Sequence, residues 1–316
     1  PVLAFLLALQ LHKKRKYVIV WSIMATFAGF AAVLFKMVRP DVKFLLTLQE
    51  GDPINHLKRK ARFLPGLFAK IFTKADHIQA ISGFLKSYAI SMGYSGEVSV
   101  VPNGVDFENF SRQIQSDILE GLKKQLNKKE SDIFIITTSR LVKKNAIDDV
   151  IRAMQYLPEN YKFLVLGIGP DFEASSQLSV DLGVDGRVTF LGYVEYSKIP
   201  KYLKISDVFI RPSLSEGLGN SFLEAMAARL PVIATEVGGI PDFLFDPEKN
   251  PDKAPTGIFC KTSNPQDIVK KIRFIVENPK LRAVIIENAY NMVKEKYTWE
   301  SVSEKMDKIL ALQASL

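Results

Sequence analysis

The feature that most constrains the fold is a regular alternation of short apolar runs with longer stretches of helical periodicity. Apolar runs of this length are typical of strands buried on both faces of a parallel sheet, and parallel strands need crossover helices between them. The alternation therefore predicts an α/β chain. At 316 residues the chain exceeds the roughly 250–300 at which a single hydrophobic core stops growing, so we expect two domains.

The alternation falls into two halves. In the first half we expect strands at 17–21, 44–48, 78–81 and 98–101, with helices at 24–37 and 54–72. In the second half we expect strands at 133–138, 163–166, 188–191, 208–210, 232–235 and 257–259, and helices at 114–128, 147–157, 172–182, 198–205, 221–228, 265–277, 280–296 and 298–312. The predicted organisation is a partial Rossmann-like domain over residues 1–112 and a second one over 113–297. A C-terminal helix over 298–316 is a candidate to return to the first domain.

The positive charge is concentrated at one end of the chain. The formal net charge is +8, and residues 1–75 hold 13 Lys/Arg against three acidic residues, which leaves 29 basic and 31 acidic residues in the rest. Such asymmetry favours an anionic partner at that end, with a merely solvated basic face as the alternative. Because no aromatic-rich recognition motif accompanies the charge, we expect no nucleic-acid partner.

Within this basic end, residues 53–74 combine six Lys/Arg residues with leucines and phenylalanines. A helix with basic residues on one face and Phe/Leu on the other docks on anionic lipid, so this stretch predicts a peripheral contact with an anionic membrane. The alternative is a helix that packs its apolar face on the sheet and keeps its basic groups in water.

Cysteine and histidine are scarce. The single Cys260 cannot form an internal disulfide or a cysteine zinc site, and only His12, His56 and His77 are available as histidine ligands. A chain of this kind suits a reducing compartment, so we expect a cytoplasmic protein, at the inner face of the membrane if residues 53–74 dock there. No metal site is expected.

The segment Pro212–Thr235 carries the clearest chemical signal. A strand is expected to end at residue 210, and a glycine-rich loop then leads into a helix. The backbone N–H groups of the first helical turn suit a phosphate or another anion; they belong to Gly217, Leu218, Gly219, Asn220 and Ser221.

Two carboxylates, Glu216 and Glu224, frame that loop. A carboxylate accepts paired hydrogen bonds from vicinal hydroxyls, so the pair is suited to hold a sugar and a ribose on either side of a diphosphate. The alternative is structural: Glu216 as a capping acid and Glu224 as a solvated helix residue. Farther upstream, Gly167 and Gly169 predict a tight βα turn.

This segment resembles the E-x7-E signature of the retaining nucleotide-sugar glycosyltransferases of family 4, which have the GT-B fold of two facing Rossmann-like domains. Further stretches resemble family motifs in the expected order: residues 75–82 (ADxIxxxS), 101–106 (PNGVD), 139–142 (GRL), 190–194 (FLG) and 231–241 (PVIAT…GGxP). The resemblance covers roughly residues 17 to 300.

The resemblance implies roles residue by residue. Glu216 is expected to contact donor-sugar hydroxyls and Glu224 the ribose, while Arg140 binds the diphosphate. The family's lysine five or six residues after that arginine is missing, because those positions are Asn145 and Ala146. Lys144 is the best substitute and Lys143 the second choice. The turn Gly192-Tyr193 is expected to lie by the base through backbone contacts.

On the acceptor side the match is weaker. The family's LTLHGxD run reads here Leu46-Thr47-Leu48-Gln49-Glu50-Gly51-Asp52, with Gln49 in the histidine position. Gln49, Glu50 and Asp52 are the candidates for acceptor contacts. The family's opening strand and glycine-rich loop have no counterpart in this sequence, so we expect a first domain that is truncated or, alternatively, unusually small.

The leading hypothesis is a retaining hexosyltransferase that moves a hexosyl unit from a nucleoside-diphosphate sugar of UDP or GDP type to a glycan or lipid-linked acceptor. No cofactor is expected. The sequence lacks an Asp-x-Asp tripeptide, and fixed positive groups aimed at the departing diphosphate stabilise its charge without a metal. The main alternative is a truncated or degenerate relative that binds nucleotide sugar without transferring it. A nucleotide-sugar epimerase is a further alternative, but no histidine is available near the sugar as its general base.

Overall fold

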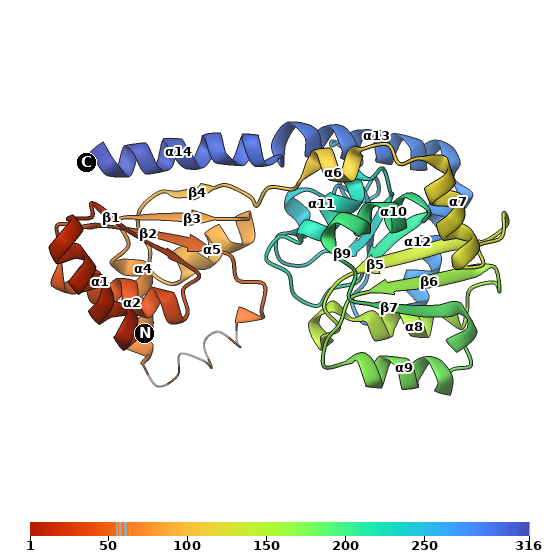
Figure 1. The fold of residues 1–316 in the computed structure, drawn as a ribbon, viewed down its shortest axis with the longest axis horizontal. Helices are drawn as coiled ribbons and strands as arrows, with labels where there is room; N and C mark the ends of the chain where they lie inside the picture. Colours follow the sequence, from red (N-terminus) through yellow and green to blue (C-terminus); the bar gives the residue numbers. More distant parts are fainter. Residues whose placement is uncertain (55, 57–58, 60–61, 63, 316) are drawn as a thin grey trace. The chain divides into compact units, whose positions relative to one another are not determined.

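The computed structural model describes residues 1–54, 56, 59, 62 and 64–315, which form two compact units (Figure 1). The first unit comprises residues 1–103, 215–218 and 300–316, and the second comprises 104–214 and 219–299. The sequence-based expectation set boundaries at 112/113 and 297/298 instead. No helix in the described part of the chain combines the length and the apolar character that crossing a membrane requires.

The first unit is built on a four-stranded parallel sheet with the order β1-β2-β3-β4. The strands are β1 (Ile19–Ile23), β2 (Lys43–Leu48), β3 (His77–Ala80) and β4 (Val98–Val100). The helices are α1 (Val2–Arg15), α2 (Phe27–Val38), α4 (Pro65–Thr73) and α5 (Gly83–Ser91). The inner strand β2 is buried from Phe44 to Leu48, as its mainly apolar run predicts.

The first strand of this unit differs from the sequence-based prediction. The first strand begins two residues later, at Ile19, because Lys16 ends α1 in a left-handed conformation and Tyr17 and Val18 stay exposed. Of the predicted helix at 54–72, the described residues Ile54, His56 and Arg59 are helical, and α4 begins at Pro65, where a proline in the first helical turn needs no N–H. Residues 55, 57, 58, 60, 61 and 63 of that prediction lie outside the described residues.

The second unit contains a six-stranded parallel sheet with the order β10-β9-β8-β5-β6-β7. Its strands are β5 (Ile133–Thr138), β6 (Tyr161–Leu166), β7 (Val188–Gly192), β8 (Val208–Arg211), β9 (Val232–Thr235) and β10 (Ile258–Cys260). The predicted strands all reappear within two residues of these bounds. The order reverses beside β5, as in doubly wound α/β folds.

Helices connect these strands. The α-helices are α6 (Phe107–Ser111), α7 (Ser116–Gln125), α8 (Ile147–Met154), α9 (Phe172–Asp181), α10 (Ile199–Lys204), α11 (Asn220–Ala227), α12 (Pro265–Glu277) and α13 (Pro279–Lys296). Short 3-10 turns lie at η1 (Lys143–Asn145), η2 (Asp185–Arg187), η3 (Tyr196–Lys198) and η4 (Ile240–Asp242). The stretch 106–131, which reads as a linker in the sequence, thus carries the two short helices α6 and α7, where the sequence predicted one helix at 114–128.

The second sheet is covered on both faces: α8 and α9 lie on one side and α10 and α11 on the other (Figure 1). Residues of β8 alternate between these layers because successive side chains of a strand point to opposite faces. Val208 and Ile210 belong to the core cluster under α8 and α12. Phe209 meets Phe222 of α11, with ring centroids 5.7 Å apart.

Helix α14 (Trp299–Ser315) belongs to the first unit from residue 300 onward. Val302 and Ile309 on this helix form a buried cluster with Leu45 of β2 and Val101 just after β4. A segment from the end of the chain therefore completes the core of the first unit.

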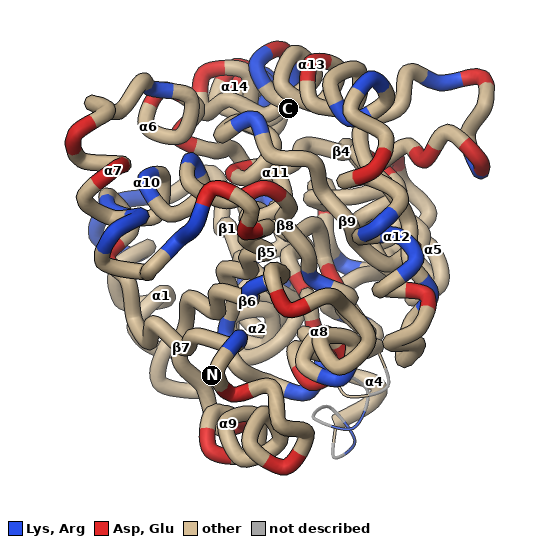
Figure 2. The backbone as a smooth tube through the Cα atoms, turned by 90° about the vertical axis from the view of Figure 1, so that its right-hand side faces the viewer, with Lys and Arg blue, Asp and Glu red and all other residues tan. Residues whose placement is uncertain are grey.

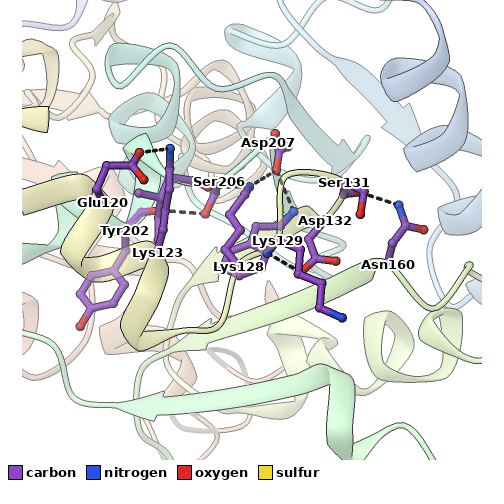
Figure 3. A network of polar contacts seen from close by, with 12 residues as sticks. Glu120, Lys123, Lys128, Lys129, Ser131, Asp132, Asn160, Tyr202, Ser206 and Asp207 are labelled. Carbon is purple, nitrogen blue, oxygen red and sulfur yellow. Dashed lines mark hydrogen bonds and ion pairs between the residues drawn. The ribbon is translucent and has the colours of Figure 1, made fainter. Parts of the chain in front are cut away.

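A polar network fixes the starts of β5 and β8 (Figure 3). The Lys128 ammonium lies 2.6 Å from the Asp207 carboxylate and donates to the Ile205 carbonyl at 2.9 Å. The same carboxylate accepts the Phe134 N–H at 2.8 Å. These bonds hold the first residues of β5 and β8 together and so align the opposite ends of the two strands.

Charges of both signs are interspersed along helices of the second unit, for example on α13 (Figure 2). The 29 basic and 31 acidic residues outside positions 1–75 agree with this mixture. The strong basic excess of the chain is confined to its first 75 residues.

Candidate functional site

The sheet order brings four loops together at the carboxyl ends of neighbouring strands β8, β5, β6 and β7. These loops are residues 212–219, 139–146, 167–171 and 193–198. In open parallel sheets ligands bind outside the carboxyl ends, at the point where the strand order reverses. The predicted donor-site residues of the second unit lie in these loops, at the last residue of β7 (Gly192) or in the first two turns of α11.

The loop after β5 is bonded to the loop after β8. The Leu214 N–H donates to the Lys144 carbonyl at 2.6 Å, and the Asn145 side chain donates to the Arg140 carbonyl at 2.7 Å. Arg140 and Lys143 are exposed and Lys144 is half-buried. The fold thus places all three predicted phosphate-binding cations beside the start of the Pro212–Asn220 loop.

The glycine pair after β6 forms the tight turn that the sequence predicts. The Gly167 N–H donates to the Gly192 carbonyl at 2.8 Å, and the Leu141 N–H donates to the Ile168 carbonyl at 3.0 Å. Gly167 has φ +143°, and a Cβ on it would overlap the Ser139 carbonyl. Only glycine permits this approach, so the turn sets the backbone position of the Arg140 segment.

Glu224 is a buried carboxylate in the second turn of α11, with 9% of its surface exposed. The Tyr196 hydroxyl donates to its Oε1 at 3.2 Å. Burial raises the pKa of Glu224 to about 7, opposed by the Tyr196 hydrogen bond and by the charge of Arg211. The alternative of a solvated helix residue is therefore wrong for this position.

Glu216 is half-buried in the loop that precedes α11, and its Oε1 accepts the Gly217 N–H at 3.1 Å. The N-cap of α11 is Gly219, with φ +96° and no side-chain cap bond. Glu216 is thus not the N-cap residue of α11 itself. Leu218 and Gly217 are buried beside it, and Asn220 and Ser221 open the helix.

The turn after β7 begins at Gly192, which has φ +65°, and continues through Tyr193, which is 74% exposed. Three residues later Tyr196 returns to the site through its bond to Glu224 and packs edge-on against the Phe110 ring, with centroids 5.3 Å apart. The turn that is expected to lie by the base is thus tied to the carboxylate that is expected to hold the ribose.

Sequence reasoning missed two residues here, Tyr196 and Arg211. Arg211 is the last residue of β8 and is 6% exposed. A signal existed for Arg211, because a charged residue that continues a buried strand needs partners inside the protein. The sequence around Tyr196 offers no comparable signal.

The acceptor-side candidates follow β2 in the first unit. Gln49 and Asp52 are half-buried. Glu50 is 1% exposed, its Oε1 accepts the Ala25 N–H at 2.6 Å, and burial raises its pKa. In the same unit the Ser215 hydroxyl donates to the Gly51 carbonyl at 3.2 Å. The acceptor role of these three residues stays a prediction.

No group of three or more His, Cys, Asp and Glu side chains suited to a metal ion occurs among the residues that the structure describes. The charged groups of the second unit at the carboxyl ends of β5 and β8 and in the first turns of α11 include Arg140, Lys143, Lys144, Arg211 and Glu224. Together with the first amides of α11, this set can bind an anion and the hydroxyls on either side of it.

Replacing Glu224 by glutamine is expected to stabilise the protein at pH 8 but not at pH 4. The pKa of Glu224 is about 7 in the folded protein and takes its ordinary value of 4.5 in the unfolded chain. The folded protein therefore binds the proton of this carboxyl more tightly than the unfolded chain does. The free energy of unfolding therefore falls as pH rises from about 4.5 to 7, by at most about 3 kcal/mol. The amide removes this cost. Denaturant unfolding at both pH values checks it, with the exposed Glu173→Gln as control; parallel pH profiles for wild type and E224Q would contradict it.

Residues 120–292 match the family model Glycosyl transferases group 1, and residues 1–109 match Glycosyltransferase Family 4. Because the first match covers more than half of the chain, the protein belongs to the glycosyl transferases group 1 family. The predicted family and its GT-B fold are confirmed.

Relatives extend this picture. The chain is 28% identical over 296 residues to the uncharacterized glycosyltransferase MJ1069 of Methanocaldococcus jannaschii, with 90% of this chain and 71% of that protein covered. It is 26% identical over 234 residues to alpha-monoglucosyldiacylglycerol synthase of Acholeplasma laidlawii. This match covers 72% of this chain and 56% of that protein. The chain thus spans about half to seven-tenths of these relatives.

Among solved structures, Anabaena Alr3699/HepE in complex with UDP superposes with a TM-score of 0.83 at 18% identity. The match covers 96% of this chain and 81% of that one. At this identity the likeness shows the fold, which is that of the family.

Proposed function

We propose that this protein is a retaining hexosyltransferase that moves a hexosyl unit from a nucleoside-diphosphate sugar to a glycan or lipid-linked acceptor. The observation that carries the proposal is the Glu216–Glu224 segment at the switch point of the second sheet. In the sequence its two carboxylates precede and follow the first α11 amides, and just before the segment the Leu214 N–H donates to the Lys144 carbonyl.

In this proposal each group has a separate task. Arg140, with Lys144 or Lys143, and the amides of residues 217–221 stabilise the charge that develops on the departing diphosphate. Glu224 accepts hydrogen bonds from the ribose, and Glu216 accepts them from the donor sugar. The Gly192-Tyr193 turn lies by the base. Because these fixed charges can serve the leaving group, the proposed reaction needs no metal and no cofactor.

The lipid-linked acceptor is supported by two independent features. The synthase of Acholeplasma laidlawii is named for a glucosyldiacylglycerol product. The basic end of this chain, including the described part of residues 53–74, suits the surface of an anionic membrane. We propose a cytoplasmic location at the inner face of a membrane, with Gln49 and Asp52 toward the acceptor and Glu50 holding the loop between them.

The test is product analysis with a defined acceptor. The protein is incubated with UDP-glucose, UDP-N-acetylglucosamine or GDP-mannose and with diacylglycerol in phosphatidylglycerol vesicles, with and without EDTA. We expect release of the nucleoside diphosphate, unchanged by EDTA, and a product whose anomeric NMR signals match the donor configuration. An inverted product would contradict retention, and loss with EDTA would contradict metal independence.

The alternative is a relative that binds nucleotide sugar without transferring it. Buried Glu50 favours it, because this candidate cannot itself meet an acceptor while it is 1% exposed. Donor binding without diphosphate release across the donor panel, on these vesicles and on oligosaccharide acceptors, would establish this alternative.

A further inference from the structure

Arg211 is a buried arginine at the carboxyl end of β8, directly before the loop of the proposed donor site. Strand alternation puts its side chain on the same face as Phe209, the face covered by α11. Its guanidinium lies 4.3 Å from the ring centroid of Phe222, in the first turn of that helix. The side chain therefore lies under the start of α11.

The guanidinium joins both ends of the loop. Its Nε donates to the Ser213 hydroxyl at 3.1 Å, just after the strand, and its Nη1 donates to the Ser221 hydroxyl at 2.7 Å, in the first turn of the helix. Nη1 also lies 3.5 Å from the Thr138 carbonyl at the end of β5. One planar group thus fixes three chain segments, which a point charge such as lysine cannot do in the same way.

The loop is shaped to admit this group. Gly219 has φ +96°, and a Cβ there would lie 3.1 Å from Arg211 Nη2 and 2.5 Å from the Phe222 ring. A side chain at residue 219 would therefore displace the guanidinium or the ring. Gly219 thus both permits the positive φ of the turn and leaves room for the Arg211 guanidinium.

From this geometry we propose that Arg211 is the positioning residue of the diphosphate site: it fixes the loop 212–221 so that its amides are held ready for the β-phosphate. The proposal rests on the proposed function and goes beyond it, because none of the family roles above involves this residue. The buried positive charge adds to the anion-attracting end of α11 at short range.

The test compares ligands that differ only in the β-phosphate. Binding of UMP, UDP, GMP and GDP is measured by calorimetry for wild type, Arg211→Gln and Arg211→Lys. For R211Q we expect roughly 10- to 100-fold weaker binding of the diphosphate that wild type prefers, and less than about threefold weaker binding of the matching monophosphate. R211K keeps the positive charge but loses the planar guanidinium. We expect its diphosphate affinity to lie between those of wild type and R211Q.

Arg187→Gln is the matched control, because Arg187 is also buried and donates to the Leu157 and Pro158 carbonyls far from the loop. R187Q should leave the diphosphate-to-monophosphate ratio unchanged. Hydrogen exchange gives a second readout that needs no ligand: R211Q should speed exchange in residues 213–221 and not in α12.

The outcomes separate the two proposals. If wild type binds none of the nucleotides, the proposed function fails. If wild type binds a diphosphate and R211Q weakens monophosphate and diphosphate equally, or weakens neither, the role of Arg211 is overturned while the proposed function stands. Unchanged exchange in residues 213–221 of R211Q would overturn the positioning role in the same way.

Discussion

Replacing Glu216 by glutamine is expected to lower the rate of hexosyl transfer by about 10²–10³-fold while nucleoside-diphosphate affinity changes less than about threefold. The reason is the division of roles along the loop. Glu216 lies before the α11 amides and is proposed to meet the sugar, which the free nucleotide lacks. Initial rates with the preferred donor, and calorimetry with its nucleoside diphosphate, measure the two quantities separately.

Two further variants serve as the comparison and the control for E216Q. Glu224→Gln removes the other carboxylate, and we expect it to weaken the nucleoside diphosphate itself, because Glu224 is proposed to hold the ribose. Glu173→Gln alters an exposed acid on α9 and should change neither quantity. Equal loss of nucleotide affinity in E216Q and E224Q would contradict the division of roles.

Replacing Gly167 by alanine is expected to destabilise the protein by about 3–5 kcal/mol, combining backbone strain with overpacking. The residue has φ +143°, and the added Cβ would overlap the Ser139 carbonyl. Relief requires the Ser139–Leu141 segment to move, and Arg140 moves with it. Denaturant unfolding should show the loss of stability, and calorimetry should show at least tenfold weaker diphosphate binding.

Gly121→Ala is the matched control for this substitution. Gly121 lies inside α7, and a Cβ on it would meet nothing within 4 Å. Because glycine is a poor helix former, alanine should stabilise the protein there by about 0.5–1 kcal/mol. A G167A protein as stable as wild type would show that the turn does not hold the Arg140 segment.

The fold of the second unit followed from periodicity because most of its strands are buried on both faces. Runs such as Ile133–Thr138 and Val232–Thr235 consist of apolar residues and threonine, and their bounds in the structure equal the predicted ones. Prediction was less accurate where local chemistry overrides pattern. Lys16 ends α1 in a left-handed conformation, so β1 begins only at Ile19. The stretch 106–131 contains the two helices α6 and α7, where the sequence predicted one.

The same distinction applies to the candidate site. Arg140 follows β5 and Glu224 lies in the helix after β8, so sequence order alone predicted that both lie at the same edge of the second sheet. Arg211 and Tyr196 act through contacts between segments 10 and 28 residues apart, with Ser221 and Glu224. Such contacts depend on side-chain packing, which one sequence does not encode in a readable pattern.

The burial of Glu224 connects stability with the proposed function. A carboxylate that is 9% exposed, with a pKa raised to about 7, costs folding free energy above neutral pH. A neutral residue would remove that cost. The presence of a carboxylate at this costly position is explained if its charge accepts hydrogen bonds from a ligand. The E224Q variant should therefore gain stability above neutral pH while it loses nucleotide affinity.

The most direct test of the central claim is a thermal-shift panel with UDP, GDP, ADP and their sugar conjugates, each with and without EDTA. At 100 times its dissociation constant a ligand adds about 2.7 kcal/mol to the free energy of unfolding, which raises Tm by several degrees. We predict stabilisation by one nucleoside diphosphate, unchanged by EDTA and reduced in Arg140→Ala. No stabilisation by any of these ligands would contradict a nucleotide-sugar site in this chain.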